Sequence, residues 1–257
     1  MRKKRRSRIV DAAAWAGVIV LLIWAFVPKI GLDLLSIGDH LDQIFVNYSG
    51  EDSASGATKD NEAVRVLHTL PVRDADPKQE YNRDAFGPAW ADVDHNGCDT
   101  RNDILKRDLA RPQFKDGTHD CIVLSGTLAE PYTGTVVDFL RGQDTSSLVQ
   151  IDHVVALANA WKSGAWAWTG DQRQLFANDP LNLLAVDGPA NRDKQAGSAD
   201  QWLPPNKDFR CDYVSRQIAV KAKWNLTVTQ LERDAMTDVL EDCPAQPLPV
   251  STTVLSP

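Results

Sequence analysis

Two apolar runs separated by a helical stretch organise the middle of the chain. Residues 146–157 are rich in β-branched and other apolar side chains, and we expect a strand there. Residues 182–187 form a second apolar run that ends at a glycine and a proline, which predicts a second strand. Between them, the alanines and tryptophans of 156–168 recur at three- and four-residue spacing, which favours a helix. Residues 189–196 follow with a proline suited to a first helical turn, so the expected order is strand, helical insert, strand, helix.

A further helix is expected near the C-terminal end. Thr229 and Glu232 have the spacing of a capping box, which predicts a helix through about Leu240. The 3.6-residue period would place three apolar side chains on one face of that helix, namely Leu231, Ala235 and Val239.

The N-terminus has the pattern of an export or anchoring segment. Residues 1–8 hold six basic side chains and no acid, and residues 12–27 have no polar side chain. Sixteen residues fall between a signal-peptide core of about 7–15 residues and a spanning helix of about 20, so a cleaved signal and an uncleaved anchor both fit. We favour the anchor because no small-x-small cleavage site follows. The positive-inside rule then predicts an extracytoplasmic protein held at the cytoplasmic membrane by this helix.

The chain therefore divides into four parts. We expect a signal anchor or signal peptide over 1–28, a juxtamembrane segment and acidic linker over 29–63, a compact domain over 64–243, and a disordered, proline-rich tail over 244–257. No internal repeat is present. A composition of 43% hydrophobic and 25% charged residues is typical of a globular domain and excludes a fibrous or disordered chain.

The net charge of −7 limits how the protein binds polyanions. The chain without residues 1–8 has 22 basic and 35 acidic side chains and is therefore strongly acidic. Nucleic-acid binding must then rest on a local site. Residues 192–223 hold seven bases and four acids, which predicts a modest positive region.

Four cysteines in an exported domain predict two disulfides. Three pairings are possible, and we favour Cys98–Cys121 with Cys211–Cys243 because each closes a local loop.

Candidate chemistry gathers around the two predicted strands. Asp152 and His153 lie side by side near the end of the first, and Asn182 opens the second. Asn191 follows nine residues later and Lys194 three residues after that, both in the short helix. This arrangement resembles the HNH, or ββα-metal, endonucleases. With DHVVALANAW, NDPLNLLAVDGPANRDKQ, WLPP and NGCDTRNDIL, residues 80–243 also resemble extracellular actinobacterial HNH proteins related to the C-terminal nuclease domain of modification-dependent restriction enzymes.

The resemblance implies an α+β fold, with a ββα-metal core inside a mainly helical, disulfide-stabilised domain. It also implies an exported, metal-dependent endonuclease with little sequence specificity, acting on DNA rather than RNA. No sequence feature indicates a protein partner.

The residue types suit phosphodiester hydrolysis. We expect His153 to be the general base that takes a proton from water, and Asp152 and Asn191 to offer oxygen ligands to one Mg²⁺ or Mn²⁺ ion. Asn182 would orient the base. Neighbouring residues of a strand face opposite sides, so the strand must end or bulge for Asp152 and His153 to share a site. Phosphate contacts are expected from Lys194, Arg192 and, on the resemblance, Arg101, although the first two also fit a solvated helix face.

An acidic loop supports a second interpretation of the function. Asp92, Asp94 and Asn96, with Asp103 in the last ligand position, outline a calcium loop, but that position is normally glutamate. The alternative function is therefore a non-catalytic, calcium-stabilised envelope module that keeps the nuclease fold.

The remaining histidines have no partner at metal-ligand spacing and are expected on the surface: His40, His68, His95 and His119. Core packing rather than base stacking is expected of Trp161, Trp166, Trp168 and Trp202.

Overall fold

A computed structural model describes residues 61–74 and 80–250 of the chain. The predicted N-terminal anchor and nearly all of the predicted linker lie outside these residues. Within the described part, no helix is both long and apolar enough to cross a membrane. The fold is a mixture of helices and strands with two disulfides, Cys98–Cys121 and Cys211–Cys243, which is the pairing favoured from the sequence.

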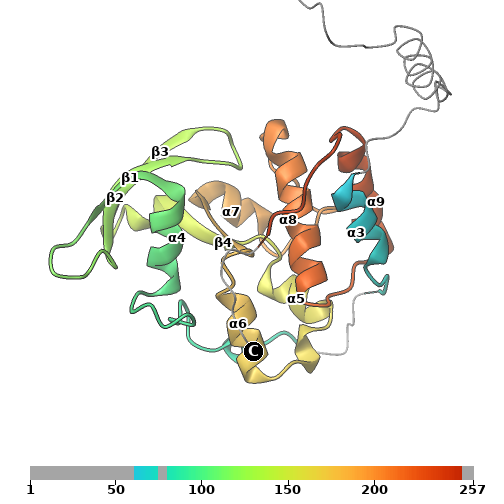
Figure 1. Ribbon diagram of the computed structural model, residues 1–257, viewed down its shortest axis with the longest axis horizontal. Coiled ribbons are helices and arrows are strands. Elements are labelled where there is room, and N and C mark those ends of the chain that lie inside the picture. Colours follow the sequence, from blue (N-terminus) through green and yellow to red (C-terminus); the bar gives the residue numbers. More distant parts are fainter. Residues whose placement is uncertain (1–60, 75–79, 251–257) are drawn as a thin grey trace, which may run out of the picture. The chain divides into compact units, whose positions relative to one another are not determined.

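A two-stranded antiparallel sheet followed by a short helix lies at the centre of the molecule (Figure 1). Strand β4 pairs with β5 without a break in register, from Val149 opposite Asp187 to His153 opposite Leu183. The helical insert between the strands and the helix after them were both predicted, whereas the first strand is shorter than expected because residues 146–148 form a 3-10 turn. The elements are β4 (Val149–His153), α5 (Leu157–Lys162), η3 (Ala165–Ala167), α6 (Gly170–Ala177), β5 (Leu183–Asp187) and α7 (Gly188–Lys194).

Three helices, α3, α8 and α9, cover one side of this centre. Figure 1 shows α3 and α9 packed beside α8, and their buried apolar side chains form one core cluster with those of β5 and α7. The disulfide Cys211–Cys243 joins the start of α8 to the chain just after α9. Their bounds are α3 (Glu62–Thr69), α8 (Arg210–Lys223) and α9 (Gln230–Glu241), with the 3-10 turn η4 (Lys207–Phe209) before α8.

Helix α9 begins where the sequence predicted but buries a different face. The Thr229 side chain accepts from the Glu232 amide, as a helix cap does. Glu232 does not complete a capping box, because its carboxylate is buried in an ion pair with Lys221, with 2.9 Å between the charged atoms. This pairing turns Glu232, Met236 and Leu240 inward, while Leu231 of the predicted apolar face is 70% exposed.

A three-stranded antiparallel sheet, not predicted from the sequence, covers the other side. It has the order β1–β2–β3 and packs with α4 against the central strands (Figure 1). Strand β1 contains a proline and two irregularities of register, so it lacks the regular alternation that identifies a strand. The remaining elements are η1 (Arg83–Phe86), α4 (Thr100–Asp108), β1 (Leu109–Phe114), β2 (Val123–Ala129), β3 (Val136–Leu140) and η2 (Ser146–Leu148).

The predicted tail is described as far as residue 250. Its residues 244–250 form neither helix nor strand, yet they contact the domain. Gln246 donates to the Asp212 carboxylate at 2.8 Å, and the Leu248 amide donates to Glu62 at 3.2 Å.

Candidate active site

The side chains of Asp152 and His153 leave β4 on opposite sides. The register of β4 with β5 is regular up to His153, the last residue of the strand, so no bulge brings the two side chains together. Each side chain accordingly has its own set of partners.

His153 is held by the C-terminal end of α6. Its Nε2 lies 2.8 Å from the carbonyl oxygen of Ala177, the last residue of that helix. The last carbonyls of a helix have no partner within the helix, so this oxygen is free to accept. The Trp90 ring lies nearly parallel to the imidazole, with 6.0 Å between ring centroids and 11° between planes.

The surroundings of His153 keep the imidazole neutral. Burial lowers its pKa from 6.5 to about 4, and the positive charges of Arg83 and Lys194 act in the same direction against the Ala177 carbonyl. A carbonyl oxygen only accepts hydrogen bonds, so in the neutral ring the proton is on Nε2 and Nδ1 keeps its lone pair. The imidazole therefore has one nitrogen fixed as a donor and the other able to accept a proton.

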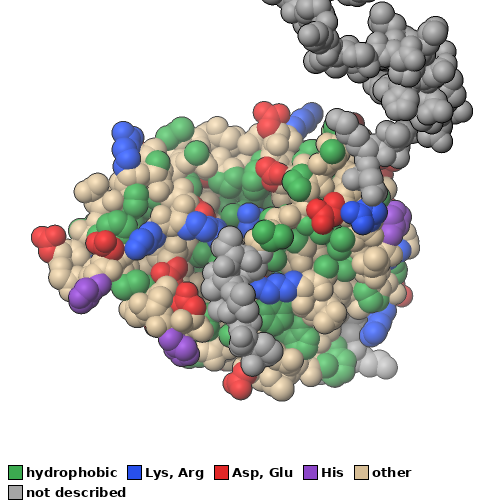
Figure 2. Space-filling view, viewed as in Figure 1, with side chains coloured by type: hydrophobic (Ala, Val, Ile, Leu, Met, Phe, Trp, Pro, Cys, Tyr) green, Lys and Arg blue, Asp and Glu red, His purple; other side chains and the backbone are tan. Residues whose placement is uncertain are grey.

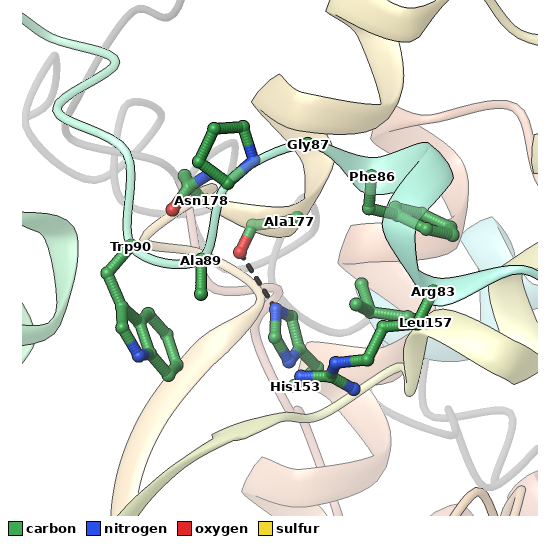
Figure 3. Close-up of a pocket in the computed structure, with 10 residues that line it drawn as sticks. Arg83, Phe86, Gly87, Ala89, Trp90, His153, Leu157, Ala177 and Asn178 are labelled. Atoms are coloured by element: carbon green, nitrogen blue, oxygen red, sulfur yellow. Dashed lines mark hydrogen bonds between the residues drawn. The ribbon is translucent and has the colours of Figure 1, made fainter.

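A pocket opens beside this imidazole (Figure 3). Figure 3 shows Arg83 and Leu157 at one side of the His153 ring and Trp90 and Ala89 at the other. Most of the wall is apolar or backbone, and Arg83 carries the only formal charge among the described residues that line it. The lining residues are Arg83, Phe86, Gly87, Pro88, Ala89, Trp90, His153, Leu157, Ala177 and Asn178.

Asp152 is part of a buried network on the other side of β4. Its carboxylate accepts from the Tyr132 hydroxyl at 2.5 Å, and Lys194 Nζ lies 3.0 Å from Oδ1 and 2.9 Å from Oδ2. Lys194 also donates to the backbone carbonyl of His153 at 2.9 Å. Burial raises the pKa of Asp152, while Lys194 and Tyr132 act to lower it. Lys194 is only 1% exposed, so in this structure it pairs with Asp152 and offers no surface for a phosphate.

Asn182 holds the chain that follows His153. The Asn182 side chain accepts from the Val155 amide at 2.8 Å and donates to the Val155 carbonyl at 3.1 Å, and its backbone carbonyl accepts from Val154. The side chain is fully buried, so both bonds are protected from water. Asn182 thus fixes the backbone that follows His153, and its role in orienting a base stays a prediction.

The other predicted site residues lie away from the imidazole. Asn191 donates to the Gln150 side chain at 2.8 Å, on the Asp152 side of the strand, because residues 150 and 152 share a face. Arg192 is exposed on α7. Arg101 donates to the carbonyls of Ser146 and Val149, at the opposite end of β4 from His153, which for five residues is about 13 Å along the strand.

The predicted positive region of residues 192–223 is weaker than its composition suggests. Lys194 and Lys221 are both buried in ion pairs, and Lys223 pairs with the buried Asp179 at 2.8 Å. Folding therefore removes two of the seven bases from the surface, and the expectation of a basic surface there was wrong to that extent.

The donor groups of the described residues do not form a ready cation site. Among the described residues there is no group of three or more His, Cys, Asp or Glu side chains placed to hold a metal. A cation at Asp152 would have to lie where the Lys194 ammonium lies, and His153 faces away from that carboxylate. The metal role expected of Asp152 and Asn191 stays a prediction.

The acidic loop uses its carboxylates within itself. Asp92 accepts from the amides of Asn96 and Gly97, and Asp94 accepts from the Asn96 amide. Burial and the nearby carboxylates raise the pKa of Asp103, although Asn96 donates to it. Calcium binding by Asp92, Asp94 and Asn96 also stays a prediction.

Several residues of the site were missed from the sequence. Arg83 and Trp90 are about 60 to 70 residues before His153, and Ala177 contributes only a backbone atom, so no motif spacing identifies them. Trp90 has a φ of 58°, which is rare for a large side chain and indicates a backbone held in place by its surroundings. Its carbonyl accepts from the Thr100 amide at the start of α4.

Comparison with known proteins shows the family of the chain. Residues 99–239 match the family described as GmrSD restriction endonucleases, C-terminal domain. An uncharacterized secreted protein of Arthroderma benhamiae is 40% identical over 183 residues, which cover 70% of this chain and 84% of that protein. No solved structure is significantly similar to the chain. With the family match extending over more than half of its residues, the chain belongs to the family of GmrSD restriction endonuclease C-terminal domains.

Proposed function

We propose that this protein is an endonuclease that hydrolyses phosphodiester bonds of DNA, with His153 as the general base and with little sequence specificity. The family of restriction-endonuclease C-terminal domains supports the reaction class. The observation that carries the proposal is the state of His153, whose neutral ring is fixed through Nε2 and keeps a free Nδ1 beside a pocket.

The reaction follows from that state. Water attacks phosphorus while its proton moves to Nδ1 of His153, which makes the imidazole cationic. The bond from phosphorus to the leaving oxygen breaks, and the electron pair of that bond stays on the oxygen. The imidazolium then gives its proton to this oxygen, directly or through solvent, so that water and a diester become a monoester and an alcohol. A positioned base of this kind contributes about 10²–10⁴-fold to the rate.

A divalent cation is expected from the family resemblance, and we keep it as a separate prediction. When bound, a cation neutralises charge on the phosphate. The ion pair of Asp152 with Lys194 does not fit this role as it stands, and no step above depends on the cation. Asn191 retains its amide oxygen as a possible oxygen ligand, because only its nitrogen contacts Gln150.

The charge of the surface favours weak and salt-sensitive DNA binding. Figure 2 shows Lys and Arg side chains mixed with Asp and Glu side chains over the face in view, rather than gathered into one basic area. Phosphate contacts carry no direct sequence information. Binding of this kind suits cleavage at many sequences.

An extracytoplasmic location is part of the proposal. The relative from Arthroderma benhamiae is named a secreted protein, and two disulfides are typical of oxidising compartments. Attachment to the cytoplasmic membrane would depend on residues 1–28, outside the described part of the chain.

The test is a cleavage assay with the purified full chain. Supercoiled plasmid, single-stranded DNA and RNA are each incubated in EDTA, Mg²⁺, Mn²⁺ or Ca²⁺, and melting temperatures are recorded in the same buffers. We expect plasmid to be nicked fastest with Mg²⁺ or Mn²⁺. An absence of cleavage of every nucleic acid in every buffer, together with a melting temperature that rises only with Ca²⁺, would favour the calcium-stabilised module instead.

A further inference from the structure

One side chain that lines the pocket beside His153 is cationic, and the proposed reaction does not use it. Arg83 belongs to the 3-10 turn η1, is exposed, and lines the pocket together with His153. In Figure 3 its guanidinium ends next to the imidazole, on the side of the ring away from Ala177. Nδ1, the nitrogen left free by the Ala177 bond, is on that side of the ring.

The surroundings of Arg83 suit an anion. Within the described part of the chain its polar partner is the Tyr81 side chain, and no ion pair joins it to an acidic residue. The rest of the pocket wall offers Phe86, Pro88, Trp90 and Leu157, which cannot neutralise a charge. A guanidinium at the edge of an apolar pocket therefore has donors to spare and little to compete with an incoming anion.

Resting on the proposed function, we propose that Arg83 binds the scissile phosphate and presents its phosphorus to the water activated by His153. The guanidinium fork matches two non-bridging phosphate oxygens and stabilises the negative charge that grows on them during attack. The substrate phosphate is thus bound in the pocket beside His153.

This assignment adds a residue from outside the family match. Arg83 precedes residues 99–239, and the site is completed by a segment that folds back across the end of α6. Arg173 of α6 fixes that segment, because its Nε donates to the Ala85 carbonyl at 2.9 Å. Arg83 is therefore held at the site by the fold.

The test compares Arg83→Met and Arg83→Lys with wild type and with Arg111→Met, which changes an exposed arginine on β1 that does not line the pocket. Plasmid cleavage gives kcat and KM, and calorimetry gives the affinity for inorganic phosphate. We expect Arg83→Met to lower kcat/KM about 100-fold or more, as loss of one transition-state contact does, and to abolish phosphate binding. Arg83→Lys should recover part of both, and Arg111→Met should match wild type. Melting temperatures of all variants should agree, because Arg83 is exposed.

The outcomes separate this inference from the proposed function. If wild type cleaves DNA, His153→Ala does not, and Arg83→Met cleaves and binds phosphate like wild type, the phosphate assignment is wrong and the nuclease proposal stands. If wild type cleaves nothing, the nuclease proposal fails, and phosphate binding still decides whether Arg83 forms an anion site. A slow Arg83→Met variant that binds phosphate normally would also overturn the assignment, since Arg83 would then act only through the shape of the pocket.

Discussion

His153 Nε2 and the carbonyl oxygen of Ala177 lie 2.8 Å apart, and this contact determines which imidazole nitrogen can act as a base. Ala177 is the last residue of α6, so its carbonyl has no partner within the helix, and His153 at the end of β4 supplies the hydrogen-bond donor. The result is a neutral ring with Nδ1 free.

The first prediction concerns pH. Because burial and Arg83 lower the pKa of His153 to about 4, the base stays unprotonated well below the pH at which an ordinary histidine becomes charged. We expect kcat/KM for plasmid cleavage to fall on the acid side with a midpoint near pH 4. A midpoint near 6.5 would show that the imidazole is solvated in the working enzyme and that the burial argument is wrong.

Trp90 is expected to fix the plane of the imidazole. Its near-parallel ring limits rotation of His153, so Trp90→Ala should lower kcat about tenfold or more with a smaller change in KM. Trp90→Phe keeps an aromatic plane and should keep most of the rate. Trp166→Ala, which removes a partly exposed indole elsewhere, serves as the control. Equal rates for Trp90→Ala and wild type would mean that the stacking contact has no role in positioning the base.

The pair Asp152–Lys194 should be required for stability. In Lys194→Met the buried carboxylate loses its counter-ion, and breaking such a pair costs about 3–5 kcal/mol in the free energy of unfolding. The double variant Asp152→Asn with Lys194→Met removes both charges and should recover much of that loss. Urea unfolding measures both, with the exposed Lys115→Met expected within about 0.5 kcal/mol of wild type.

A further variant, Asp152→Asn alone, tests the metal role of Asp152. If Asp152 binds the cation, Mg²⁺ raises the melting temperature of wild type and not that of Asp152→Asn. If the ion pair persists during catalysis, Mg²⁺ affects the two proteins equally.

Asn182 should position the base through the chain that follows it. Asn182→Asp keeps an acceptor for the Val155 amide but places a negative charge against the Val155 carbonyl. We expect a loss of about 1–3 kcal/mol in unfolding free energy for Asn182→Ala, since both Val155 groups are left unpaired in the interior. Both variants should lower kcat, with a smaller change in KM. Wild-type kinetics in a folded Asn182→Ala variant would assign the residue to stability alone.

The central strands and helix could be predicted because their sequence carries both periodicity and a motif of fixed spacing. Residues 183–186 are continuously apolar and are followed by turn residues, and the strand found there spans Leu183–Asp187. The disulfide pairing could be predicted because each bridge closes a short loop. These features depend on residues close together in the sequence.

The rest of the site depends on contacts between distant residues. Lysine is among the residues that are rarely buried, so the burial of Lys194 and Lys221 could not be expected without knowing their acidic partners. The rotation of α9 follows from the same Lys221–Glu232 pair. Arg83 and Trp90 reach His153 only because the chain before α4 folds across the end of α6, which the sequence pattern does not encode locally.

The most direct test of the central claim is the initial rate of plasmid nicking by His153→Ala. The matched control is His68→Ala, which removes an exposed imidazole on α3. If His153 is the general base, its alanine variant stays folded and loses about 10²–10⁴-fold in rate, while His68→Ala cleaves like wild type. A His153→Ala variant that nicks plasmid as fast as wild type would contradict the account.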